Sequence, residues 1–157
     1  MIQIHPNIMT DDDCLQFINF YNDNLDKMKR VDNDNVYHFE GVNLINNLND
    51  FEFFKKINLN YGHIDRIRVQ HVNRDTNILE KFHTDKQPFA FIVFLNDDFM
   101  GGELICENVI ITPKKKTLVH TSGNEPHYVK AVPEGERFTL VCFMKQYHDF
   151  NKIKNVI

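Results

Sequence analysis

The 157-residue sequence contains no tryptophan and little cysteine, glycine or proline, with three, six and five residues respectively. Cys14, Cys106 and Cys142 are far apart in the sequence and include no Cys-x-x-Cys pair. This pattern argues against a disulfide framework and against a zinc ribbon, so we expect reduced thiols in a cytoplasmic protein. Because repeats, low-complexity segments and linkers are also missing, the length predicts one domain, residues 1–157.

Long apolar runs and dense positive charge are missing as well. No run approaches the roughly 20 apolar residues of a membrane span, and the N-terminus lacks the pattern of a secretion signal, so we expect no membrane partner. The formal net charge is -4, and the dense basic run is Lys114–Lys116, which we interpret as a solvated hairpin tip. Duplex nucleic acid is therefore a disfavoured partner. Frequent Asn, Ile and Lys are typical of an AT-rich genome, such as that of a phage or a low-GC bacterium.

The sequence is instead rich in phenylalanine, with 14 residues that we expect in the core. Thr10, followed by three aspartates, predicts the start of a helix, and apolar residues at intervals of three and four predict a second helix over Val42–Ile57. Between them, residues 27–40 are polar, with a predicted loop tip at Asp32–Asn35. This segment is interpreted as a connector or as a mobile lid.

From Ile64 onward, the residue types and short spacings are those of β-strands. Expected strands cover about Ile64–His71, Leu79–His83, Phe89–Leu95, Glu103–Ile105, Val109–Thr112, Thr117–Thr121, His127–Val132 and Arg137–Lys145. Many short strands behind two helices predict a mainly β fold with N-terminal helices. We expect a double-stranded β-helix (jelly-roll) core over residues 64–146, buttressed by helices within residues 1–60.

Two His-x-Asp tripeptides are present, His63-Ile64-Asp65 and His83-Thr84-Asp85, and chance alone supplies about one in such a chain. The second tripeptide is followed by His127, 42 residues after Asp85, and by Arg137 ten residues later. Two imidazoles and one carboxylate on one face of a metal form the ligand set of non-haem Fe(II) oxygenases. Residues two apart on a strand project to the same side, so His83 and Asp85 can reach one ion.

Three further segments follow in a characteristic order: 94–104 (FLNDDFMGGEL), 126–129 (PHYV) and 135–139 (GERFT). With His83-Thr84-Asp85, this order resembles the Fe(II)/2-oxoglutarate-dependent dioxygenases of the prolyl 4-hydroxylase type, over about residues 64–146. The resemblance implies that Fe(II), 2-oxoglutarate and O2 are the cofactors, with ascorbate as an accompanying reductant. It implies His83, Asp85 and His127 as catalytic metal ligands.

The resemblance also implies a cosubstrate pocket. Arg137 begins an apolar strand, where an unpaired charge is costly, and in the family a basic residue at this place holds the distal carboxylate of 2-oxoglutarate. Thr139 lies two residues further on the same face and can donate its hydroxyl to that carboxylate. Relatives often have Tyr where Phe94 stands, and Phe cannot donate that hydrogen bond. Another Tyr is usual near the place of His71, which we therefore predict to be a pocket residue.

The resemblance implies hydroxylation of a C–H bond, with a prolyl residue in a peptide or protein as the leading substrate. The alternatives are hydroxylation of a free amino acid, another protein side chain or a nucleobase. A metal-binding jelly roll without turnover is a different class, which needs the metal ligands but not Arg137. His120 is interpreted as a pocket residue or a core histidine, and Arg66 with Arg68 as substrate contacts or a solvated strand face.

Overall fold

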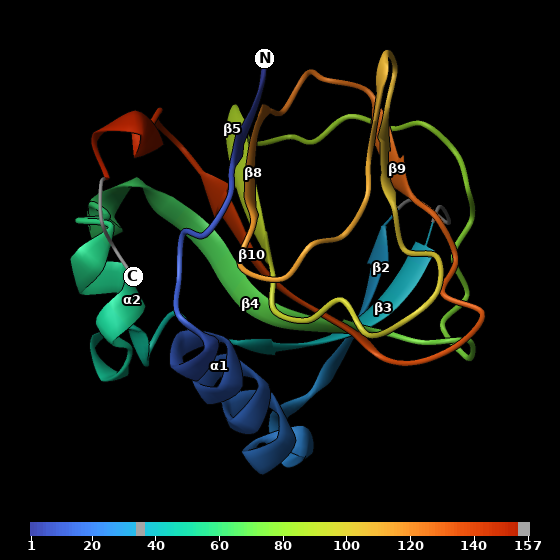
Figure 1. The fold of residues 1–157 in the computed structure, drawn as a ribbon, viewed down its shortest axis with the longest axis horizontal. Helices are drawn as coiled ribbons and strands as arrows, with labels where there is room; N and C mark the ends of the chain where they lie inside the picture. The colour runs from blue at the N-terminus through green and yellow to red at the C-terminus, as the bar shows by residue number, and fades with distance from the viewer. Residues whose placement is uncertain (34–36, 154–157) are drawn as a thin grey trace.

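The computed structural model describes residues 1–33 and 37–153 and shows a curved antiparallel sheet between two helices and a smaller sheet (Figure 1). The large sheet has seven strands in the order β1-β8-β5-β10-β4-β3-β2, and the small sheet has three in the order β7-β6-β9. Their bounds are β1 Ile2–His5, β2 Lys29–Asn33, β3 Tyr37–Asn43, β4 Ile64–Val72, β5 Phe89–Phe94, β6 Leu104–Cys106, β7 Val109–Ile111, β8 Leu118–Ser122, β9 His127–Val129 and β10 Arg137–Met144. The predicted mainly β, jelly-roll fold class is confirmed.

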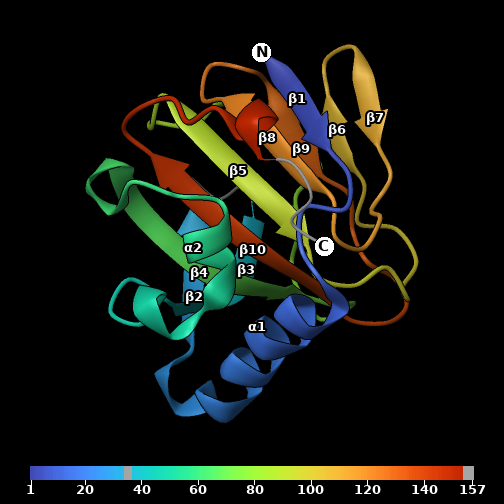
Figure 2. The same ribbon diagram turned by 60° about the vertical axis from the view of Figure 1, so that its left-hand side comes forward.

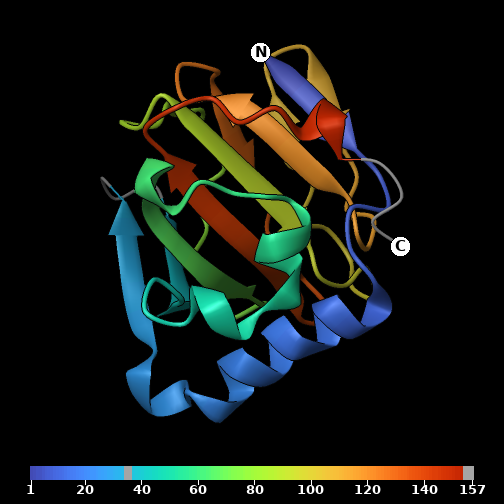
Figure 3. The same cartoon turned by 90° about the vertical axis from the view of Figure 1, so that its left-hand side faces the viewer.

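The helices lie against one face of the large sheet, in front of it in Figure 3. They are α1 (Asp11–Asp23) and α2 (Glu52–Lys56), with short 3-10 helices η1 (Leu25–Lys27), η2 (Leu48–Asp50), η3 (Tyr61–His63) and η4 (Phe150–Lys152). Thr10 and Asp13 form the predicted N-terminal cap of α1, each side chain bonding the other's backbone N–H at 3.0 Å. The buried Phe17 ring stacks on Phe51 at 4.5 Å, so phenylalanines join the helices over the sheet.

The second predicted helix, Val42–Ile57, is wrong for most of its length. Its first residues end strand β3, and only Glu52–Lys56 is an α-helix. The Asn43 side chain accepts a hydrogen bond from the Ile45 backbone N–H at 2.8 Å, which favours a turn over a helix. Except for Ile45, the apolar residues of the segment are buried all the same, because an irregular chain can also place them over the sheet.

Two other predicted elements differ from the structure. Residues 27–40, interpreted as a loop, mostly form the hairpin of β2 and β3, which extends the large sheet by pairing with β4 (in Figure 2 the hairpin lies behind α2 and β4). Residues 34–36 of the predicted loop tip lie outside the described residues. The strand expected over Leu79–His83 is absent: only His83 forms a bridge, while Leu79 and Phe82 are about half exposed.

The basic run Lys114–Lys116 is partly exposed to solvent, as the sequence predicted, but it is not a hairpin tip, because β7 and β8 belong to different sheets. The Lys115 and Lys116 ammonium groups lie 3.0 and 3.3 Å from one carboxylate oxygen of Asp11. Hydrogen bonding and charge from these lysines lower the pKa of Asp11. The connection between β7 and β8 is thus tied to the first turn of α1.

The strand β10 shows how the sheet separates a core from a pocket. Leu140, Cys142 and Met144 belong to the large hydrophobic core beneath the helices. The intervening residues Arg137, Thr139, Val141 and Phe143 line a pocket on the other face. Because side chains alternate along a strand, the central strands β4, β5, β8 and β10 each contribute one row to the core and one to the pocket.

His120 lies on the core side of β8, so the pocket interpretation of this residue is wrong. Its side chain is fully buried, its ring lies 5.0 Å from that of Phe150, and its Nδ1 lies 3.4 Å from Gln3 Oε1. Burial lowers the pKa of His120 to about 4, and that of the neighbouring His5 is lowered for the same reason against the opposing effect of Asp149. His120 is therefore neutral in the folded protein near pH 6.

We expect acid to destabilise the protein through His120. Below pH 6.5 the unfolded chain protonates this histidine, whereas the folded protein does not until about pH 4, so the free energy of unfolding falls as pH falls through this window. In urea titrations between pH 7 and 4, His120→Gln should therefore show a shallower decline than the wild type, with part of the slope remaining through His5. Equal slopes for the two proteins would contradict this assignment.

Candidate active site

His83, Asp85 and His127 come together at the mouth of the pocket. One ligand atom from each lies within 4.8 Å of the others, and within the described ranges no second group of three His, Cys, Asp or Glu residues does this. Asp85 lies between the imidazoles: its Oδ1 is 3.9 Å from His83 Nε2, and its Oδ2 is 3.5 Å from His127 Nε2. The three side chains are mostly buried but not sealed, so small ligands have access to the site.

The backbone holds the two histidines side by side. His83 and His127 exchange both of their N–H to carbonyl hydrogen bonds, each at 3.0 Å, in an isolated antiparallel bridge. The Asp85 N–H donates to Gly123 O at 2.8 Å. Gly123 is required by this close approach, because a Cβ there would lie 1.8 Å from Gln87 O. The chain thus positions all three side chains without help from a strand at 79–83.

The hydrogen bonds of the imidazoles suit a metal-binding role. His127 Nδ1 lies 2.8 Å from Glu125 O, and His83 Nδ1 lies 3.5 Å from Lys81 O, so each ring can donate to a carbonyl two residues before it. An Nδ1–H donor fixes the tautomer whose Nε2 carries the lone pair, and Nε2 is the atom that faces Asp85 in both rings. Two neutral imidazoles and one carboxylate fit Fe(II) with coordination positions left for other ligands.

A mostly apolar pocket extends from these residues into the space between the two sheets. Its polar lining consists of the His-Asp-His set together with Gln70, Thr121, Arg137 and Thr139. Its apolar lining consists of Val72, Ile78, Ala90, Ile92, Leu104, Val119, Val129, Val141 and Phe143. Phe143 of β10 pairs with Ala90 at the end of the pocket near the metal ligands. Counted along the pocket-facing residues of β10, Thr139 and Arg137 are two and three positions further from these ligands.

Arg137 is a buried cation at the deep end of this pocket. Its side chain is 2% exposed, and burial lowers its pKa to about 10. Its Nε donates to Gly102 O at 3.1 Å, and its guanidinium carbon lies 5.5 Å from the centroid of the Phe94 ring. Among the residues that the structure describes, no carboxylate pairs with it. A buried guanidinium without a counter-ion is costly, so this end of the pocket is suited to an anion.

The Gly101-Gly102 pair makes room for Arg137. Gly102 has a φ of 71°, and a Cβ at this position would lie 2.8 Å from Arg137 Cδ. Gly101 has a φ of 77°, and a Cβ there would lie 2.2 Å from Ala131 O. Both glycines are therefore needed by conformation and by space, and Gly102 supplies the carbonyl that holds the guanidinium.

Thr139 is a second buried polar residue at this end of the pocket. Its side chain is fully buried, and its hydroxyl makes no hydrogen bond. A buried hydroxyl is normally satisfied, so this atom indicates a missing acceptor in the pocket. Thr139 is two residues from Arg137 on the same face of β10, and both donors point to one anion-binding end.

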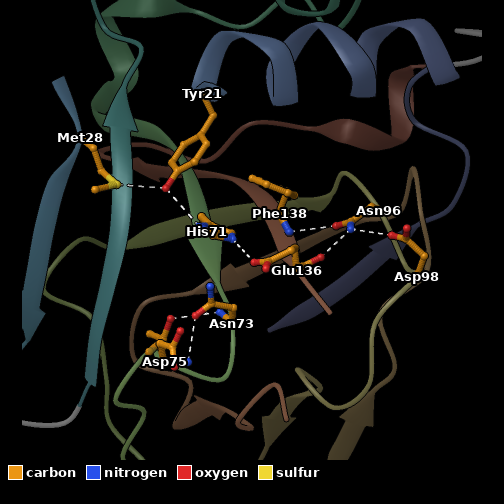
Figure 4. Close-up of polar contacts among 10 residues, drawn as sticks. Tyr21, Met28, His71, Asn73, Asp75, Asn96, Asp98, Glu136 and Phe138 are labelled. Carbon is orange, nitrogen blue, oxygen red and sulfur yellow. Dashed lines mark hydrogen bonds and ion pairs between the residues drawn. The ribbon is translucent and has the colours of Figure 1, made fainter. Parts of the chain in front are cut away.

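His71, which the sequence predicted as a pocket residue, lies on the opposite face of the sheet. Its Nδ1 lies 3.2 Å from Tyr21 Oη, its Nε2 contacts the Glu136 carboxylate, and its ring stacks on Phe138 at 4.7 Å (Figure 4). The alternation along β4 explains the correction: Gln70 and Val72 face the pocket, so His71 between them cannot. His71 instead ties α1 to the strand that carries Arg137.

Asn96 fixes the start of that strand. Its amide nitrogen donates to Glu136 O at 2.7 Å, and its amide oxygen accepts from the Phe138 N–H at 2.9 Å (Figure 4). These bonds hold the residues on either side of Arg137. The Leu95-Asn96 part of the sequence motif therefore acts on the position of the guanidinium.

Sequence reasoning missed Gln70, which is buried and lines the pocket. Its strand, β4, has no clean apolar face, so the pattern alone did not show which residues face inward.

Arg66 and Arg68 lie on the same face of β4 as Gln70, with guanidinium carbons 4.9 and 5.5 Å from the centroid of the Phe143 ring, yet neither lines the pocket. In the other His-x-Asp tripeptide, His63-Ile64-Asp65, the Asp65 carboxylate accepts a hydrogen bond from Gln87 at 2.9 Å.

No family model matches the sequence, and no curated protein matches it. Among solved structures, a Trichoplax adhaerens prolyl hydroxylase, solved with a peptide fragment of the hypoxia inducible factor oxygen degradation domain, matches with a TM-score of 0.69, 15% identity and coverage of 91% of this chain and 82% of that one. A Pseudomonas putida prolyl-4-hydroxylase matches with a TM-score of 0.65, 11% identity and coverage of 93% and 92%. The non-haem α-ketoglutarate-dependent epimerase of nogalamycin biosynthesis matches with a TM-score of 0.68, 11% identity and coverage of 90% and 76%.

These similarities define the fold of the chain as that of the 2-oxoglutarate-Fe(II) oxygenases. Within that class, the prolyl hydroxylases are among its structural neighbours. In the part of the chain that the structure describes, no helix is long and apolar enough to cross a bilayer.

Proposed function

We propose that the protein is an Fe(II)- and 2-oxoglutarate-dependent dioxygenase that hydroxylates a C–H bond. The observation that carries this proposal is that one pocket contains both His83, Asp85 and His127 and an anion-binding end formed by Arg137 and Thr139. A dicarboxylate with one end on a metal and the other on a buried arginine satisfies both features. The shared fold supports the same conclusion.

Each residue has a distinct role in this proposal. The Nε2 atoms of His83 and His127 and the carboxylate of Asp85 hold the metal, while the carbonyls of Lys81 and Glu125 fix the two rings. Arg137 and Thr139 bind and orient the distal carboxylate of 2-oxoglutarate, and the apolar lining excludes water from it. Fe(II) with 2-oxoglutarate and O2 would supply the oxidative decarboxylation coupled to C–H hydroxylation, which side chains cannot perform.

For the substrate, we propose a prolyl residue in a peptide or protein. Two of the structural neighbours described above are prolyl hydroxylases, and one of them was solved with a peptide. In this chain an aromatic pair flanks the metal ligands: Phe82 precedes His83, Tyr128 follows His127, and their rings meet edge to face at 4.9 Å. Phe82 is 47% exposed, so this pair offers an apolar surface on which a pyrrolidine ring can pack.

A small-molecule substrate is the second candidate. It is favoured by the epimerase of nogalamycin biosynthesis, which shares the fold at a TM-score comparable with those of the prolyl hydroxylases. The link from Asp85 to β5 is also short, only Lys86-Gln87-Pro88, which leaves little chain to grip a long peptide.

Succinate formation tests the proposed activity. Wild-type protein incubated with Fe(II), 2-oxoglutarate and ascorbate under air should form succinate, at a rate raised by candidate prolyl peptides, and His83→Ala should reduce this rate by at least about a hundredfold. Product peptides should gain one oxygen atom by mass spectrometry. Wild-type protein that binds the metal but neither binds nor consumes 2-oxoglutarate would instead identify a metal-binding module without turnover.

A further inference from the structure

We propose that Gln70 is a third donor to the distal carboxylate of 2-oxoglutarate, an inference that rests on the proposed function. Gln70 lies on β4 directly opposite Thr139 of β10, and Phe94 of β5 lies opposite Thr139 on its other side. The row Phe94–Thr139–Gln70 therefore crosses the floor of the anion-binding end. In this row Phe94 has no polar atom, whereas the Gln70 carboxamide has two N–H donors.

The orientation of the Gln70 amide is set by Arg68, two residues earlier on the same face of β4. With the amide oxygen toward the guanidinium, it accepts hydrogen bonds from Arg68 Nε at 2.7 Å and from Nη2 at 3.1 Å. The opposite orientation would place the amide N–H groups against the guanidinium donors, which excludes it. The amide nitrogen is consequently turned away from Arg68, and because Gln70 lines the pocket, this nitrogen is available to a ligand there.

The position of Arg68 is itself fixed on two sides. Its guanidinium carbon lies 5.5 Å from the centroid of the Phe143 ring. Gly41 of β3, the partner of Gln70 in the sheet, leaves room for its stem, since a Cβ at Gly41 would lie 3.2 Å from Arg68 Cδ. Arg68 thus acts as a positioning residue, and Gln70 as the group that touches the ligand.

Because the Gln70 amide is buried, a hydrogen bond that it donates to a ligand would contribute to binding. Gln70 is 7% exposed and lies in the same pocket as the Thr139 hydroxyl, which makes no hydrogen bond, and the Arg137 guanidinium, which has no carboxylate partner among the described residues. A charged acceptor in this place would satisfy all three groups at once, and hydrogen bonds to charged acceptors are the stronger kind. Gln70 on β4 would thereby supply the hydrogen bond that Phe94 on β5, on the other side of β10, cannot supply.

Calorimetric titration of the Mn(II)-loaded protein without oxygen tests this role. We expect Gln70→Leu to weaken 2-oxoglutarate binding by about tenfold and the isosteric Gln70→Glu, which adds a repelling charge, by about a hundredfold or more. Binding of 2-oxobutyrate, which is 2-oxoglutarate without its distal carboxylate, should change less than about twofold in both variants. Arg68→Met, which releases the amide, should weaken 2-oxoglutarate binding by a smaller factor.

The outcomes separate this inference from the proposed function. Equal losses for 2-oxoglutarate and 2-oxobutyrate would show that Gln70 only supports the pocket structurally, and unchanged affinity in Gln70→Glu would show that its amide does not face the carboxylate. Either result would overturn the inference while leaving the dioxygenase proposal standing. A wild-type protein that does not bind 2-oxoglutarate at all would overturn both.

Discussion

Replacing Asp85 by alanine should lower the affinity for Fe(II) or Mn(II) by at least about a hundredfold and abolish succinate formation. The Asp85 carboxylate is the single anionic ligand of the proposed set and lies within 4 Å of both ligand nitrogens. Without it, a divalent cation would be held by two neutral imidazoles, which do not compensate its charge. Metal binding is measured directly by titration with Mn(II), so the result does not depend on turnover.

The chain provides its own control in the other His-x-Asp tripeptide, His63-Ile64-Asp65. Asp65→Ala removes a carboxylate at the corresponding position of His63-Ile64-Asp65, where Asp65 contacts Gln87 and Arg66. Its metal affinity and succinate formation should equal those of the wild type within about twofold. If Asp65→Ala lost the metal and Asp85→Ala retained it, the assignment of the metal site would be wrong.

Replacing Arg137 by methionine or alanine should raise the 2-oxoglutarate concentration required for half-maximal activity by about a hundredfold or more. The expectation follows from burial: truncating one partner of a buried charge pair typically costs 2–5 kcal/mol of binding energy. Metal content should remain nearly intact, because Arg137 lies at the other end of the pocket from the His-Asp-His set. The variants are compared by steady-state kinetics in 2-oxoglutarate and by metal analysis.

Thermal stability adds a second observable to this experiment. Without ligand, Arg137→Met should unfold at a temperature no lower than the wild type, because it removes a buried, uncompensated charge while its side chain fills much of the same volume. Saturating 2-oxoglutarate should stabilise the wild type and not the variant. Unchanged cosubstrate affinity in Arg137→Met would refute the carboxylate-binding role.

The strands were more predictable from the sequence than the helices. Phe89–Leu95 around β5 and Leu140–Met144 in β10 are continuously apolar because both faces of these strands are covered, and such runs are distinctive. In contrast, Leu48, Phe51 and Phe54 recur at helical spacing, although much of their segment is not helical. Periodicity reports which residues are buried against a surface, and it does not report the backbone conformation that places them there.

The candidate site was predictable where a residue's chemistry is unusual for its position. A charge at the start of an apolar strand singled out Arg137. The order of the flanking motifs, through their resemblance to a known family, separated His83, Asp85 and His127 from the other His-x-Asp tripeptide. Gln70 and His71 were not distinguishable in this way, because which of two adjacent residues faces the pocket depends on the register of β4 with β10. That register is set by contacts between segments more than 60 residues apart in the sequence, which local patterns do not contain.

The paired hydrogen bonds between His83 and His127 have a consequence for how the proposed metal site would be loaded. Because these bonds join backbone atoms, they keep the two ligand-bearing segments adjacent whatever occupies the space between the rings. The conformational entropy of bringing the two ligand-bearing segments together is therefore lost when the chain folds. Metal binding does not have to supply this cost again. Folding and metal loading would then be separable events, so a protein folded without metal would keep its native state and could take up the metal later.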